Sequence, residues 1–141
     1  MAFADYKVEY TDVKDARGNV VGSVRPLNDV DFSLLWQKHA EAMDLLVSNF
    51  LRAKSDESGL DLGAVVAGAV RTAPDLVTDA ICVASDEHED DWDAVFNAVS
   101  RMPIGLRIEA LNAVIRTTSE AEGGVAKVLF LINATRPKAE A

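Results

Sequence analysis

The spacing of apolar residues in this chain changes once, close to Pro26, from a period of two to a helical period. Before Pro26, apolar and polar side chains alternate over Tyr6–Tyr10, which is typical of a β-strand. A second, β-branched run, Val20–Val24, follows the turn-rich segment Asp15–Asn19. These features predict a β-hairpin within residues 1–27. Two strands alone are marginally stable in water, so the hairpin must pack on the helices or on a partner.

After Pro26 the apolar residues follow one face of a helix. They predict one long helix that begins near Asn28 or Asp29, where a side chain can cap the first turn, and fades near Ser55. The stripe consists of residues spaced three or four apart: Phe32, Leu35, Trp36, His39, Met43, Leu46, Val47 and Phe50.

Five shorter helices are predicted downstream, separated by prolines, glycines and an acidic link. Their approximate bounds are Leu60–Arg71, Asp75–Ser85, Trp92–Val99, Ile104–Ser119 and Val125–Thr135. The last helix is apolar on nearly all sides, so it should lie centrally in the core or be covered by another chain. The sequence therefore predicts a mainly α fold. It divides into an N-terminal β-hairpin arm over residues 1–27, a bundle of about six helices over residues 28–136, and a disordered tail over residues 137–141.

The composition limits the classes of partner. The chain has 141 residues, the size of one domain, and a formal net charge of -9. An acidic chain repels nucleic-acid phosphates and anionic lipid surfaces, so neither nucleic acid nor membrane is expected as a partner. No segment approaches the ~20 apolar residues that a bilayer requires, and the N-terminus lacks the apolar core of a signal peptide. Cys82 is the one cysteine, which excludes an internal disulfide and suits a reducing cytoplasm.

No pattern in the sequence predicts catalysis. The chain lacks a GxSxG motif, the glycine-rich phosphate loops and an HExxH zinc motif. The carboxylates between Asp86 and Asp93 could offer oxygen ligands to a divalent cation, but the glycine and glutamate of an EF-hand are missing. A solvated charge run that caps the next helix is the favoured interpretation, and a metal-dependent enzyme the weaker alternative. His39 and Cys82 are expected to be packed residues, so we expect no enzyme, no metal site and no cofactor.

Two apolar segments are the candidates for contact with a partner protein. One is the stripe of the long helix and the other is the apolar run of the last helix. The alternative for each residue is that it belongs to the core of the chain itself. The candidate partner-binding residues are Trp36, Met43, Phe50, Leu129, Phe130 and Ile132.

The order of elements from about Val24 to Ala134 resembles a known family. The resemblance depends on a loose pattern of helices, prolines and one glycine pair, and the hairpin before Val24 is not part of it. The segments that carry it are Val24-Arg25-Pro26-Leu27-Asn28-Asp29-Val30, Ala73-Pro74-Asp75-Leu76-Val77, Met102-Pro103-Ile104, Ile108-Glu109-Ala110-Leu111-Asn112-Ala113-Val114 and Glu120-Ala121-Glu122-Gly123-Gly124. This pattern is similar to that of the tail assembly chaperones of long-tailed bacteriophages, also called pre-tape measure proteins.

The resemblance implies a binding protein without turnover. Members of the family coat the tape measure protein, a very long helical chain, keep it soluble in the host cytoplasm, and are displaced as the tail tube polymerises. They are usually absent from the finished virion. Many are also made as a longer, frameshifted form that recruits tail tube subunits, and Pro137-Lys138 could be encoded by a slippery run. Whether this chain also forms a homo-oligomer is left open.

A structural tail or connector component of the virion is the alternative function. The predicted hairpin motivates it, because a free strand edge can join neighbouring subunits.

Overall fold

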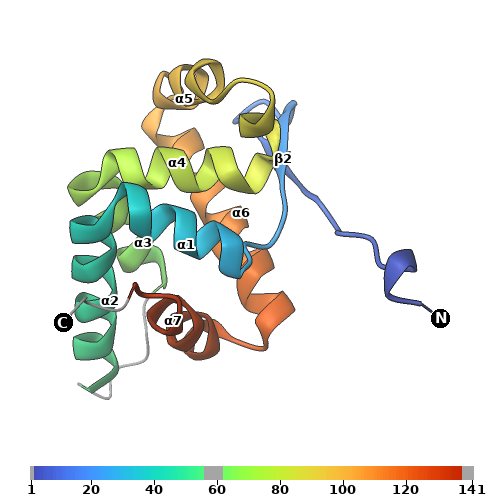
Figure 1. The fold of residues 1–141 in the computed structure, drawn as a ribbon. Helices are drawn as coiled ribbons and strands as arrows, with labels where there is room; N and C mark the ends of the chain where they lie inside the picture. Colours follow the sequence, from blue (N-terminus) through green and yellow to red (C-terminus); the bar gives the residue numbers. More distant parts are fainter. Residues whose placement is uncertain (1, 56–61, 138–141) are drawn as a thin grey trace.

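The chain forms a bundle of helices, with a small hairpin on one side and an N-terminal segment that projects from the body (Figure 1). The computed structural model describes the backbone of residues 2–55 and 62–137, and the side chains of residues 2–49 and 66–137. The predicted mainly α fold with an N-terminal hairpin is confirmed. In chain order the elements are η1 (Phe3–Asp5), β1 (Thr11–Lys14), β2 (Val20–Val24), α1 (Asp29–Lys38), α2 (Ala40–Ser55), α3 (Leu62–Thr72), α4 (Pro74–Ser85), η2 (Glu87–Glu89), α5 (Trp92–Ser100), α6 (Ile104–Glu122) and α7 (Val125–Ala134).

Two of the predictions fall on residues that the structure does not describe. The predicted tail over residues 137–141 lies outside the described residues except for Pro137. The predicted start of the second helix, at Leu60, also lies outside the described residues.

The hairpin pairs a different first strand from the predicted one. Strand β1 is Thr11–Lys14, not Tyr6–Tyr10, and it runs antiparallel to β2 with Thr11 opposite Val24. The turn is tight, because the Asp15 carboxylate accepts hydrogen bonds from two backbone N–H groups within it. Pairing extends outward from this turn, so β2 ends opposite Thr11 and the preceding residues have no strand beside them. Alternation of side chains showed an extended segment but could not show its register.

A buried charge network ties the hairpin to the helices. The Arg25 guanidinium lies 2.6 Å from a carboxylate oxygen of Asp31, in the first turn of α1, and 2.8 Å from one of Asp86, just after α4. The Arg25 backbone N–H also donates to the Ala84 carbonyl. Asn28, one of the two predicted caps, closes α1 in a reciprocal capping box with Asp31. The junction between strand and helix is therefore fixed by several contacts of one arginine, through its backbone and its side chain.

The predicted long helix is two helices. Helix α1 ends at Lys38 and α2 begins at Ala40, with His39 between them at φ -138° and ψ 47°. His39 Nε2 lies 2.6 Å from Oδ2 of Asp79, a buried carboxylate of α4. We attribute the break to this contact. Since the apolar stripe continues across His39, periodicity could not reveal it.

Helix α4, not the last helix, is at the centre of the fold. All residues from Leu76 to Ala84 are buried, and α4 packs against α1, α3, α5, α6 and β2. Helix α7 instead lies at the edge of the bundle, against α6, α2 and α1 (Figure 1). The strongly apolar sequence of α7 is thus only partly explained by burial within the described chain. Within that part of the chain, no helix is both long and apolar enough to cross a membrane.

Candidate functional site

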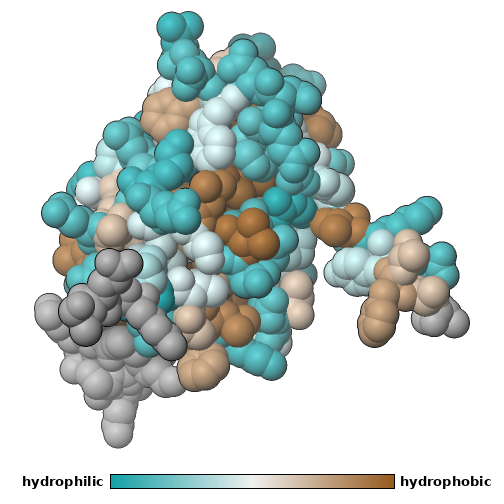
Figure 2. All heavy atoms as spheres, in the orientation of Figure 1, coloured by the Kyte–Doolittle hydropathy of each residue, from teal (hydrophilic) through white to brown (hydrophobic). Residues whose placement is uncertain are grey.

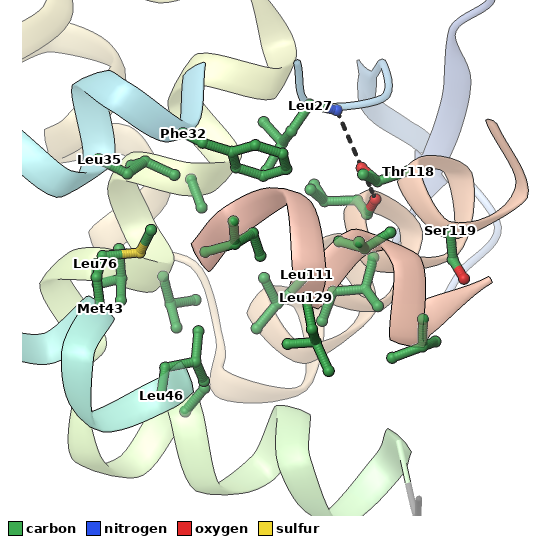
Figure 3. A pocket seen from close by; sticks show the side chains of 18 residues that line it. Leu27, Phe32, Leu35, Met43, Leu46, Leu76, Leu111, Thr118, Ser119 and Leu129 are labelled. Carbon is green, nitrogen blue, oxygen red and sulfur yellow. Dashed lines mark hydrogen bonds between the residues drawn. The ribbon is translucent and has the colours of Figure 1, made fainter. Parts of the chain in front are cut away.

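An apolar cavity of about 110 Å³ lies beside α7. Figure 3 shows side chains from several helices pointing toward it, including the sulfur of Met43. Apolar atoms make up nearly all of its lining, so it can accept an apolar group and offers nothing to bind an ion or activate water. The residues labelled in the figure are Leu27, Phe32, Leu35, Met43, Leu46, Leu76, Leu111, Thr118, Ser119 and Leu129.

The Thr118 hydroxyl lies at the edge of this cavity and makes two hydrogen bonds within the chain. Its hydroxyl oxygen accepts a hydrogen bond from the Leu27 backbone N–H at 3.0 Å and donates one to the Val114 carbonyl at 2.6 Å. Figure 3 shows Leu27 and Thr118 joined in this way. Because the hydroxyl both donates and accepts a hydrogen bond within the chain, the buried threonine does not make the cavity a polar site.

Helix α7 covers one side of the cavity and is held by few polar contacts. The Trp36 indole N–H donates to the Ile132 carbonyl at 2.9 Å. The Arg136 guanidinium lies 4.7 Å from the centre of the Trp36 ring and pairs with Asp44 on α2. Helix α7 follows a glycine pair, Gly123 and Gly124, with φ of 90° and 134°, values that other residues rarely adopt. The two glycines permit the sharp reversal that lays α7 back on the bundle.

The candidate partner-binding residues divide between the core and the surface. Trp36, Met43, Leu129 and Ile132 are buried in the core of the chain itself. Phe130 is 70% exposed, which is unusual for a phenylalanine. Phe50 lies in α2, but its side chain is outside the described residues. Of the candidates whose side chains are described, Phe130 is therefore the one that a partner can reach without rearrangement.

Figure 2 shows where apolar surface gathers on one face of the molecule. Brown patches lie over the region of α1 and α7, between hydrophilic patches, and further apolar atoms lie on the projecting N-terminal segment. On the outer face of α7, Phe130 stands four residues from each of the exposed alanines Ala126 and Ala134. This spacing forms a narrow apolar stripe with small residues on either side of one aromatic ring.

A polar cluster surrounds Asp79, and no sequence pattern considered above indicates it. The Asp79 carboxylate is buried in α4 and accepts a hydrogen bond from the Trp92 indole N–H at 2.7 Å, in addition to its contact with His39. The Lys38 ammonium lies 3.9 Å from this carboxylate and 3.9 Å from the centre of the Trp92 ring. One charged residue within a run of apolar residues in a helix was the available signal, since such a charge needs partners. The cluster joins α1, α4 and α5, which is a structural role.

Side chains of the acidic link after α4 form an ion pair and cap a helix. Asp86 binds Arg25, and the Asp91 side chain caps α5 by accepting from the Ala94 backbone N–H. Among the residues that the structure describes, no three His, Cys, Asp or Glu side chains are grouped so that they could hold a metal ion. Burial raises the pKa of the Cys82 thiol to about 12, so this cysteine is a poor nucleophile at neutral pH.

Comparison with known proteins agrees with the resemblance and extends it. The whole chain, residues 1–141, matches the family model described as "Pre-tape measure protein". The match therefore includes the hairpin before Val24, which the resemblance did not. No curated protein and no solved structure matches the chain.

Proposed function

Because this chain belongs to the pre-tape measure protein family, we propose that it is a phage tail assembly chaperone that binds and solubilises the tape measure protein. In this role it acts in the host cytoplasm, helps to recruit tail tube subunits, performs no catalytic turnover and leaves before the virion is complete. The family name links the chain to the tape measure protein. The observation that carries the proposed binding mode is the exposed apolar stripe on α7, centred on Phe130.

The chemistry of the stripe suits a helical partner with an apolar seam. Ala126 and Ala134 are small, so another helix can approach the backbone of α7 closely while Phe130 inserts between its side chains. The apolar cavity beneath α7 leaves room for its buried residues to adjust when a partner presses on the outer face. A contact of this size gives each copy only a modest affinity for the partner. A long tape measure chain that binds many copies would still be covered, and each copy could be displaced singly.

Replacing Phe130 by serine should weaken binding to the tape measure protein by about tenfold or more, because an exposed aromatic anchor is lost. The measurement is the amount of tape measure protein recovered in the soluble fraction when the two are produced together. The folded chain should be unaffected, with a change in unfolding free energy within about 0.5 kcal/mol.

The matched control is Val30→Ser, which removes a 69% exposed apolar side chain that belongs to α1 and not to the stripe. If both variants keep the tape measure protein soluble as well as the unaltered chain does, the α7 stripe is not the binding surface. If the unaltered chain does not solubilise it, the chaperone function itself is wrong.

In this proposal, a longer product of the same gene recruits the tail tube subunits. A frameshift close to Pro137-Lys138 would add residues after the bundle without changing its fold. Mass spectrometry of infected cells should detect peptides that cross this junction. A gene that lacks a slippery run there would remove this part of the proposal.

The second candidate function is a structural tail or connector component of the virion. The projecting N-terminal segment favours it, since exposed apolar segments often join subunits. Purified particles distinguish the two functions. A structural component should be present at stoichiometric amounts, whereas the chaperone should be absent.

A further inference from the structure

The residues before β1 form an apolar extension with no place to pack on their own chain. The N-terminal extension (residues 2–10) leaves the body and ends in the short turn η1 (Figure 1). Its apolar side chains are all exposed, and Phe3 is completely so. The hydrogen bonds that the structure gives for residues 2–9 are local ones, within residues 2–6. Tyr10 fastens the base of the extension, because its hydroxyl donates to the Asp86 carboxylate.

The extension cannot pair with its own β1. It runs directly into β1 at Thr11, so folding back along that strand would require a turn between Tyr6 and Thr11. The intervening residues, Lys7 to Tyr10, include no glycine, proline or asparagine, the residues that tight turns favour. An extended segment that alternates Tyr6, Val8 and Tyr10 with charged side chains therefore has the pattern of a strand without a strand partner in its own copy.

A groove that fits such a strand lies on the same molecule, between β1 with its turn and the N-terminal half of α6. Its volume is about 840 Å³, and Val13 and Leu106 contribute apolar lining. Strand β1 pairs with β2 alone in the described sheet, so one edge of β1 carries backbone groups that a further strand can bind. Four extended residues, Tyr6–Glu9, span about 13 Å and match the length of the four-residue strand β1.

We propose that the N-terminal extension of one copy of this chain adds as a strand to β1 in the groove of a second copy. The backbone would supply the hydrogen bonds, and Tyr6 and Val8 would supply the side-chain contacts. The proposal concerns self-association and does not depend on the tape measure protein. If two copies exchange their extensions, they form a closed dimer. If each copy gives its extension to the next one, the copies form an open chain.

The exposed strand pattern of the extension, which has no strand partner in its own copy, indicates a second copy as the occupant. The charged lining of the groove is balanced, with three cations (Lys14, Arg17, Arg116) and three carboxylates (Asp12, Asp15, Glu109). The extension carries two carboxylates, Asp5 and Glu9, and one ammonium group, Lys7, which such a mixed lining can accept. Two bodies that each carry a net charge of -9 repel one another. A thin extension can cross the space between them with only a few charges of its own.

The test is sedimentation velocity of the full chain over a range of concentrations, up to about 1 mM so that a weak complex is populated. The unaltered chain should form dimers or longer species that dissociate on dilution. A variant without residues 2–9 should stay monomeric, and Tyr6→Ser with Val8→Ser should weaken association at least about tenfold. Val30→Ser, which removes an exposed apolar side chain elsewhere, should associate normally.

The receiving side is tested by Gly105→Gln. Gly105 lines the groove in the first turn of α6, and a Cβ there meets no atom within 4 Å, so the longer side chain should fold normally and obstruct the groove. This variant should be monomeric alone. Mixed with the variant without residues 2–9, it should form a 1:1 complex, because one partner supplies the extension and the other the groove. A monomeric unaltered chain, or a mixture in which no 1:1 complex appears, would overturn the proposal.

Discussion

Arg25→Ala should lower the free energy of unfolding by about 3–5 kcal/mol, because it leaves the buried Asp31 carboxylate without its countercharge. Arg25 and Asp31 are both buried, and the same guanidinium also binds Asp86 and donates to the carbonyls of Pro26 and Val83. The loss should be measured by urea unfolding at neutral pH, followed by circular dichroism. The hairpin should detach first, since Arg25 is its main polar link to the helices.

Arg17→Ala is the matched control, because Arg17 is an exposed arginine in the turn of the same hairpin. Its effect should stay within about 0.5 kcal/mol. A loss below about 1 kcal/mol for Arg25→Ala would mean that water replaces the guanidinium, and that the network is far less buried than the structure indicates.

The same network gives stability a defined dependence on pH. The hydrogen bond from Arg25 lowers the pKa of Asp86 below its usual value of 3.8, and the Tyr10 hydroxyl acts in the same direction. A carboxyl group with a lowered folded pKa stabilises the fold above its unfolded pKa and loses that contribution as the pH falls through the folded value. Between pH 4 and pH 2 the free energy of unfolding should therefore fall more steeply in the unaltered chain than in Arg25→Ala, in which Asp86 has lost its main partner.

Trp36→Ala should lower the free energy of unfolding by about 3–5 kcal/mol, because a large buried side chain is removed from the core. Trp36 is 3% exposed and joins α1 to α7 through its hydrogen bond to the Ile132 carbonyl. The effect should be concentrated in α7, which would lose its indole contact and the Arg136 contact together. Hydrogen exchange of the α7 amides should then be faster than that of the central helix α4.

Trp36→Phe separates packing from hydrogen bonding. It keeps most of the buried ring, and the Ile132 carbonyl still accepts a hydrogen bond from the Thr135 hydroxyl at 2.8 Å. A cost of about 1 kcal/mol or less is therefore expected. Equal costs for Trp36→Phe and Trp36→Ala would show that the hydrogen bond, not the packing of the ring, holds α7 in place.

Local patterns in the sequence determined most of the secondary structure. The prolines and the glycine pair mark the ends of helices because proline cannot continue one and glycine adopts the positive φ that ends one. Asn28 could be named as a cap from its own chemistry and its distance from the apolar stripe. These features depend on residues a few positions apart, so a single sequence contains them.

Tertiary structure alone decided the remaining features. The break at His39 depends on Asp79, forty residues away, and the packing of the hairpin on the helices depends on the contacts of Arg25 with Asp31 and Asp86. Whether an apolar residue of α7 is buried depends on which neighbours cover it, so Leu129 and Phe130, adjacent and equally apolar, have opposite environments. Periodicity identifies an apolar face, but only the packing of distant segments determines which part of that face stays exposed to a partner.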